Sequence, residues 1–186
     1  MLMTVEELKK YINTDETDEM LAAKLKALEL TIRKYTNNNF MVRGIRTTAD
    51  AFNKTFTCKT VANFKVGDTV QVSMSDFMDG LLCTIAKIED NTITVNEDIY
   101  HEDDVLVTKV EYPEDVKMGA VNILKWQLRN DAAASGDKSA MPVQSETISR
   151  HSVTYAQDST EADLDADFGV PKKYIAFLKA YHKARF

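Results

Sequence analysis

The spacing of apolar residues changes twice along this chain, and this change constrains the fold more than any other feature. Apolar residues recur at helical intervals up to about Tyr35, at intervals close to two from about Arg43 to Glu111, and at helical intervals again after Pro113. We therefore predict an α+β protein in which a small bundle of about four helices, formed by residues 1–43 and 112–186, is interrupted by an inserted β module at residues 44–111.

The first two helices carry recognisable start and stop signals. Thr4 and Glu7 have the spacing of a capping box, and either Thr17 or Asp18 can cap the second helix. The Asn-rich segment "TNNNF" ends that helix, because Asn tolerates the left-handed conformation that helix ends often need. The apolar face of the second helix comprises Leu21, Leu25, Leu28, Ile32 and Tyr35, and that of the helix after Pro113 comprises Val116, Ala120, Val121, Leu124 and Leu128.

The segment between these helices has the marks of short strands joined by tight turns. "FKVGDTVQVSM" contains a Gly67–Asp68 turn, and "GLLCTIAKIEDNTITVNEDI" contains two strands joined at Asp90–Asn91. Several short strands within so few residues predict a small barrel of the SH3-like or OB-like type.

Residues 171–186 predict a closing helix that is both apolar and basic. Tyr174, Phe177, Leu178 and Tyr181 fall on one face, and we expect the first three to pack in the core. We expect Lys179, Lys183, Arg185 and Phe186 to point outward and to contact a partner, because aromatic and arginine side chains are favoured interface anchors.

The segment "VQSETISRHSVTYAQ", residues 143–157, has strand-forming residues but few apolar ones. It could be a catalytic loop around His151, a surface hairpin, or an arm for another subunit. An arm of this kind buries little surface in its own subunit, yet its main chain can pair with a neighbour's strand. The residues alone leave these three interpretations open.

The search for catalytic and metal-binding motifs favours a protein that is not an enzyme and needs no cofactor or metal. P-loop, dinucleotide-binding, zinc-protease and nucleophile-elbow motifs are all absent from the sequence. Ser149 and His151 share a strand face without an identifiable acidic partner, and the cluster at residues 101–104 reads as a solvated turn. The alternating Asp163, Asp165 and Asp167 imitate a calcium loop, but the glycine comes one place late and Tyr174 stands where a glutamate is needed.

Charge and cysteine content bear on partners and compartment. The net charge is −6 and the pI about 5.1, whereas a protein that grips DNA phosphates needs a basic face. Cys58 and Cys83 form no CxxC motif, which indicates a reducing compartment and no zinc site. The opening "MLMTVEELKK" turns acidic before a signal-peptide core could form, and no apolar run reaches membrane-spanning length, so we expect neither secretion nor a membrane.

The order of these segments resembles the tailed-phage head–tail connector proteins, also called adaptors or head-completion proteins. "TVEELKKYINTDETDEMLAAKLKALELTIRKYTN" is similar to their opening, "YPEDVKMGAVNILKWQLRN" to their next helix, and "GVPKKYIAFLKAYHKARF" to their closing helix. "VQSETISRHSVTYA" resembles their arm, with Ser145, Glu146, Ile148, Ser152 and Tyr155 in matching places and Arg150 between them. The resemblance covers residues 4–43 and 112–186, and many members lack the β module, so it assigns the module no role.

The resemblance implies a structural virion protein, assembled in the host cytoplasm and located in the head–tail neck. It implies a ring, commonly a dodecamer, attached below the portal, with DNA crossing its channel and a stopper or tail-completion protein on its tail side. The closing helix would bind the portal, and the arm would contact neighbouring subunits. The residues so implicated are Tyr174, Phe177, Lys179, Tyr181, Lys183, Arg185 and Phe186 for the portal and Ser145, Glu146, Ile148, Arg150, Ser152 and Tyr155 for the arm.

Two alternative functions remain open at this point. The first is a nucleic-acid-binding module that acts through the β insertion, although no aromatic and basic strand face stands out there. The second is a small hydrolase that uses His151 or the acidic loop, which the motif search disfavours.

Overall fold

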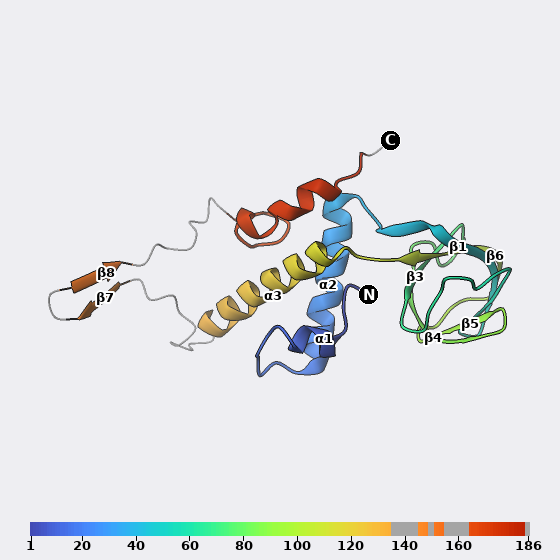
Figure 1. The fold of residues 1–186 in the computed structure, drawn as a ribbon, viewed down its shortest axis with the longest axis horizontal. Helices are drawn as coiled ribbons and strands as arrows, with labels where there is room; N and C mark the ends of the chain where they lie inside the picture. The colour runs from blue at the N-terminus through green and yellow to red at the C-terminus, as the bar shows by residue number, and fades with distance from the viewer. Residues whose placement is uncertain (135–144, 149–150, 155–163, 185–186) are drawn as a thin grey trace. The chain divides into compact units, whose positions relative to one another are not determined.

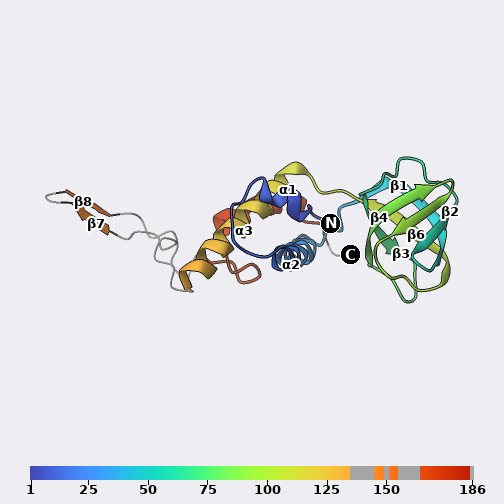
Figure 2. The same cartoon turned by 90° about the horizontal axis from the view of Figure 1, so that it is seen from below.

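The computed structural model describes residues 1–134, 145–148, 151–154 and 164–184, and they form an α+β protein (Figures 1 and 2). The chain divides into two compact units. One comprises Met1–Leu2 and Asn38–Tyr112 and holds the barrel, and the other comprises Met3–Asn37 and Pro113–Phe186 and holds the helices. The barrel therefore lies in the sequence between two halves of the helical unit.

The helical unit begins with α1 (Val5–Lys9) and α2 (Asp18–Thr36), both capped as their sequences predict. The Thr4 hydroxyl accepts the Glu7 N–H at 3.1 Å, and the Thr17 hydroxyl accepts the Met20 N–H at 3.3 Å. Each cap satisfies one of the amide groups that the first turn of a helix leaves unbonded. Asn37 ends α2 in the left-handed conformation, at φ 48°, which confirms the stop signal.

The apolar faces of the long helices are buried where the periodicity places them. Leu21, Leu25, Leu28 and Ile32 of α2 are buried, and Tyr35 is half-buried. Helix α3 (Glu114–Ala134) buries Val116, Ala120, Val121, Ile123 and Leu124 and leaves Leu128 partly exposed. Each fully buried Val, Leu or Ile side chain among them contributes about 1.5–3 kcal/mol through the apolar surface it removes from water.

The closing segment corrects the expected α-helix at 171–186. It forms two short 3₁₀ helices, η2 (Lys172–Tyr174) and η3 (Ala176–Tyr181), preceded by Pro171 in an extended conformation. Ile175 and Leu178 are buried and Tyr181 is half-buried, which is the spacing of three that aligns side chains on a 3₁₀ helix. The segment contacts both α2 and α3, so its geometry follows the surface it packs on.

Part of the expected arm is a hairpin. Strands β7 (Ser145–Ile148) and β8 (His151–Thr154) pair antiparallel in a two-stranded sheet of their own, in the register Ser145↔Thr154 and Ile148↔His151. The remaining arm positions, including Arg150 and Tyr155, lie outside the described residues.

The second unit is a closed barrel of six antiparallel strands in the order β1-β2-β5-β4-β3-β6, with β6 paired back onto β1. The strands are β1 (Met41–Phe52), β2 (Thr55–Cys58), β3 (Thr69–Ser73), β4 (Leu82–Glu89), β5 (Thr92–Val95) and β6 (Glu102–Val110). The Asp90–Asn91 turn joins β4 to β5 as predicted, with Asp90 at φ 48°. Full closure leaves no unpaired strand edge in the barrel.

Alternation along the strands fills the barrel with apolar side chains. Phe56, Val70, Val72, Ile85 and Ile93 are almost completely buried. The small residues Ala49 and Ala51 also point inward from β1, where they leave room for these larger neighbours. The chain enters and leaves the unit at one end of the barrel, where the Glu111 N–H bonds the Phe40 carbonyl at 3.0 Å.

Candidate functional site

The closing segment is bound to the rest of the helical unit by its aromatic residues. The Tyr181 hydroxyl lies 2.7 Å from each carboxylate oxygen of Asp115, in the first turn of α3. This hydrogen bond, followed by burial and by the negative charge of Asp115, raises the pKa of Tyr181 above its ordinary value. The ring of Phe177 lies against Gly119, so close that a Cβ at Gly119 would stand 2.1 Å from the ring.

A second set of contacts holds the end of the segment on α2. The Lys183 N–H bonds the Thr36 carbonyl at 2.9 Å, and the Asn37 side-chain amide donates to the Lys183 carbonyl at 3.2 Å. The His182 ring meets the Tyr35 ring edge-on at a centroid distance of 4.8 Å. The carbonyl of Thr36, the last residue of α2, thereby finds a partner in the chain's own closing segment.

The predicted portal-binding residues separate into two groups in this geometry. Tyr174, Phe177 and Tyr181 are half-buried, and the contacts of Phe177 and Tyr181 are with α3 of the same chain. Lys179 and Lys183 are exposed, as are Lys172 and Lys173 before them. Arg185 and Phe186 lie outside the described residues. The exposed positive charge of the segment therefore comes from four lysines, whereas Phe177 and Tyr181 hold the segment against α3.

Three residues that position this segment were not identified from the sequence. Ile175 is buried at 3% exposure, Asp115 accepts the Tyr181 hydroxyl, and Gly119 provides the space for Phe177. Gly119 was nevertheless visible in the sequence as a glycine inside a predicted helix. Such a glycine costs helix stability and often marks a place where another segment packs closely against the helix.

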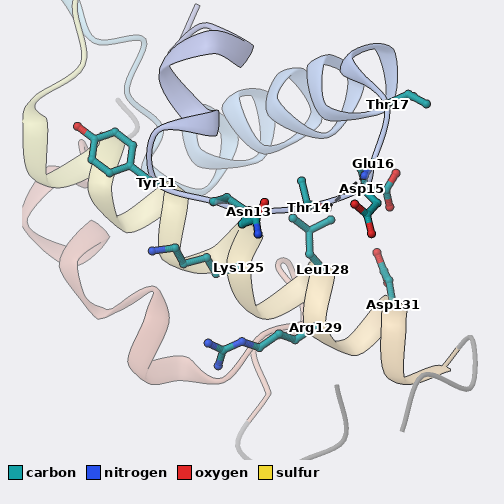
Figure 3. A pocket seen from close by; sticks show the side chains of 11 residues that line it. Tyr11, Asn13, Thr14, Asp15, Glu16, Thr17, Lys125, Leu128, Arg129 and Asp131 are labelled. Carbon is teal, nitrogen blue, oxygen red and sulfur yellow. Dashed lines mark hydrogen bonds between the residues drawn. The ribbon is translucent and has the colours of Figure 1, made fainter. Parts of the chain in front are cut away.

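A groove of about 660 Å³ lies in the helical unit between the α1–α2 loop and α3 (Figure 3). The buried Ile12 and the partly exposed Leu128 supply its apolar surface. Lys125 and Arg129 lie one turn apart on α3, and Figure 3 shows Asp131 near the loop that carries Asp15 and Glu16. Along the second half of α3 the two cations therefore precede the carboxylate of Asp131, which lies beside the acidic residues of the loop.

The acidic end of this groove is linked to α2 by Lys24. The Lys24 ammonium group lies 2.6 Å from Asp131 and 3.6 Å from Glu16. The hydrogen bond to Asp131 raises the pKa of Lys24, so this lysine stays charged and holds the loop, α2 and α3 together. Asn13, Asp15, Arg129 and Asp131 are exposed to solvent, and such an open, wet trough is suited to a peptide segment more than to a small substrate.

Among the residues that the structure describes, those considered for catalysis and metal binding do not form a common site. Within the described residues, no group of three or more His, Cys, Asp or Glu side chains could hold a metal ion. His101 and Asp103 lie 3.8 Å apart on the surface, and the Asp165 carboxylate accepts the Asp167 and Phe168 N–H groups of its own turn. His151 lies in β8, and Ser149 and Asp163 lie outside the described residues.

The two cysteines are free and buried in the barrel. Burial raises the pKa of Cys58 to about 11 and that of Cys83 to about 12, so neither thiol is a ready nucleophile. No helix in the described part of the chain is long and apolar enough to cross a membrane. No known protein family and no curated protein matches this sequence.

Proposed function

We propose that this chain is a structural subunit of a tailed-phage neck, a head–tail connector that forms a ring under the portal and extends the DNA channel toward the stopper or tail. In this proposal the helical unit is the connector core. The barrel, of the small SH3-like or OB-like kind, is an insertion into that core.

The observation that carries the proposal is the hairpin β7–β8, a sheet of only two strands. An isolated two-stranded hairpin is marginally stable in water, and it gains stability when a further strand or another subunit adds to it. Because every copy of a ring carries the same hairpin, each copy can supply a hairpin to one neighbour and receive one from the other. The arm residues Ser145, Glu146, Ile148 and Ser152 lie in these two strands.

The closing segment supports the portal contact. Lys179 and Lys183 are exposed while Ile175 and Leu178 anchor the backbone beneath them, so their charges are presented from an ordered base. We propose these lysines, with Arg185 and Phe186, as the residues that meet the portal. Repeating the contact around a ring makes individually weak surface ion pairs effective together.

The alternative of nucleic-acid binding through the barrel receives no support from its charge. Nucleic-acid surfaces combine aromatic side chains with cations, whereas the exposed Phe77 and Tyr100 of this barrel lie in loops that contain Asp76, Asp79 and Asp98.

The portal contact is tested with the double charge reversal Lys179→Glu and Lys183→Glu. Deleting the whole segment would be a poor test, because it removes Ile175 and Leu178 from the core. We expect the variant to keep its melting temperature and to lose binding to portal rings purified from the same phage, observed by electron microscopy. The matched control is Lys10→Glu with Lys26→Glu, two exposed lysines of the same unit. Failure of the wild-type protein to bind the portal would refute the connector role.

The subunit contact is tested with Glu146→Ala combined with Ile148→Ala. We expect sedimentation to show weaker association between copies, while the thermal melting of each subunit changes little. Equal losses in association and in subunit stability would place the hairpin in the core of its own subunit and would remove the main support for the proposal.

A further inference from the structure

The topology of the barrel brings three connections to the end opposite the one at which the chain enters and leaves. Phe52 pairs with Thr55 at the β1–β2 turn, and Thr55 pairs with Thr94 near the end of β5. Ser73, the last residue of β3, pairs with Leu106 in the middle of β6, and the Ser75 hydroxyl just beyond it bonds Glu102, the first residue of β6. The β1–β2 turn (residues 53–54), the β3–β4 loop (74–81) and the β5–β6 loop (96–101) therefore share one end, which we call the aromatic end.

Large apolar side chains gather on this end without covering one another. Phe52 is 62% exposed, Met74 and Phe77 are each 73% exposed, and Tyr100 is 67% exposed. The rings lie in pairs, with Phe77 and Tyr100 at a centroid distance of 6.4 Å and Phe52 and His101 at 5.4 Å. Single exposed apolar residues are ordinary on protein surfaces, but several together on one end are typical of an interaction site.

The loops that carry these side chains are held in place by internal hydrogen bonds. The Glu102 carboxylate accepts the Ser75 hydroxyl and the Asp76 N–H, each at 2.6 Å. Met78, at 3% exposure, closes the end of the core, and its sulfur accepts the Tyr100 N–H at 3.1 Å. The exposed rings therefore stand on an ordered framework, and little conformational entropy remains to be lost when a partner binds.

The charge around these rings has one sign. Residues 50–54, 74–81 and 96–104 contain eight carboxylates and a single lysine, an excess that is larger than the net charge of −6 of the whole chain. That lysine, Lys54, is itself paired with Asp98 at 3.0 Å. The exposed carboxylates are those of Asp50, Asp76, Asp79, Asp98, Asp103 and Asp104.

The exposed rings and the surrounding carboxylates together determine which class of partner can bind the aromatic end. A nucleic acid would bring phosphates to a field that repels them, and a second aromatic end from another copy would bring like charges together. A protein segment with lysine or arginine around an apolar anchor fits both features, since the anchor covers the rings and the cations meet the carboxylates. We propose that the aromatic end is a docking surface for such a basic segment of another protein. The proposal concerns the barrel alone and holds whether or not the chain is a connector.

The test uses the full-length protein and a labelled synthetic peptide in which a tryptophan and two leucines are flanked by lysines. We expect binding by fluorescence anisotropy, weakening as the ionic strength rises, and no binding of a matched peptide with glutamates in place of the lysines. Phe77→Ser combined with Tyr100→Ser should weaken binding about tenfold or more, because aromatic anchors dominate such surfaces.

The matched control is Val66→Ser, which changes a residue of similar exposure, 63%, in the β2–β3 loop at the other end of the barrel. Its affinity should equal that of the wild type. The proposal is overturned if the wild type binds no lysine peptide, if the control loses as much affinity as the double variant, or if the glutamate peptide binds equally well. It is also overturned if the double variant abolishes binding to a single-stranded oligonucleotide or self-association in sedimentation, because the surface would then serve those partners.

Discussion

The ring of Phe177 occupies the space in which a side chain at Gly119 would stand, with 2.1 Å between the ring and an added Cβ. The closing 3₁₀ helix can therefore lie close against α3 only because position 119 lacks a side chain. The contact joins two parts of the helical unit that are far apart in the sequence, and it leads to a first prediction.

We expect Gly119→Ala to destabilise the helical unit by about 1–3 kcal/mol, because the methyl group must displace the half-buried ring. In a Phe177→Ala background the same change should become neutral or stabilising by up to about 1 kcal/mol, because alanine favours the helix. A double-mutant cycle by urea denaturation measures the difference. Additive effects of the two substitutions would show that the ring and the glycine do not interact.

A second prediction concerns alkaline pH and the bond between Tyr181 and Asp115. The fold raises the pKa of Tyr181 above 10.0, so the stabilising bond is complete below that value and is lost as the pH rises through the folded-state value. Absorbance titration of the phenols should show Tyr181 ionising late, and Asp115→Asn should lower its pKa toward 10.0. Tyr181→Phe identifies the signal, and an unchanged titration in Asp115→Asn would contradict the assigned cause.

A third prediction is that the two compact units respond separately to damage in their cores. Phe56→Ala in the barrel should cost about 3–5 kcal/mol, a large part of the stability of a small domain. At about pH 8 a thiol with a pKa of about 11 is ionised to roughly one part in a thousand, so Cys58 should react with a thiol reagent only when the barrel opens.

Phe56→Ala should therefore expose the thiols of Cys58 and Cys83 to the reagent, while the helical circular dichroism signal of the other unit persists. Leu124→Ala, which should cost about 2–5 kcal/mol in α3, is the matched control and should leave the thiols protected. Equal thiol exposure in both variants would show that the units unfold as one.

A fourth prediction separates two roles of Asn37. Its left-handed backbone ends α2, and its side-chain amide holds the Lys183 carbonyl. Asn37→Gly should keep the helix end but speed hydrogen exchange of the Lys183 amide, whereas Asn37→Ala should add about 1–2 kcal/mol of backbone strain. Identical melting temperatures for the two variants would mean that the left-handed conformation carries no cost.

A fifth prediction concerns acidic pH at the aromatic end. The Ser75 hydroxyl, together with the Asp76 and Phe77 N–H groups, lowers the pKa of Glu102 below 4.5. The resulting stabilisation is fully present above pH 4.5 and is lost as the pH falls through the folded-state pKa of Glu102. Glu102→Gln should speed exchange of the Asp76 amide at neutral pH, with Glu89→Gln, an exposed glutamate of β4, as its control. Unchanged exchange in Glu102→Gln would contradict this role.

The features that the sequence predicted correctly are those determined by near neighbours. The caps at Thr4 and Thr17, the end of α2 at Asn37 and the turn at Asp90 each depend on a few adjacent residues. The 3₁₀ form of the closing segment was not predictable, because it consists of one helix of three residues and one of six, and within a single turn spacings of 3.0 and 3.6 place nearly the same residues on one face. Its geometry depends on Gly119, which lies far away in the sequence.

The barrel was predictable as a class but not in its details. Strand β1 is hard to recognise in the sequence because its inward residues Ala49 and Ala51 are small, whereas the alternation typical of a strand is recognised mainly from large apolar side chains. The aromatic end could not be found from the sequence, because Phe52, Phe77 and Tyr100 are separated by more than twenty residues and meet only through the strand register.

The hydrogen bond between Glu111 and Phe40 bears on how such a chain can arise and be re-engineered. The two ends of the segment Asn38–Tyr112 lie side by side at this bond, and the rings of Phe40 and Tyr112 are 4.8 Å apart. Because its ends are adjacent, the folded module connects α2 to α3 over as short a distance as a tight loop would. Replacing it with a short linker therefore changes the entropy of closing that connection little. Genetic recombination can therefore insert, remove or replace the barrel without changing the path of the chain through α2 and α3.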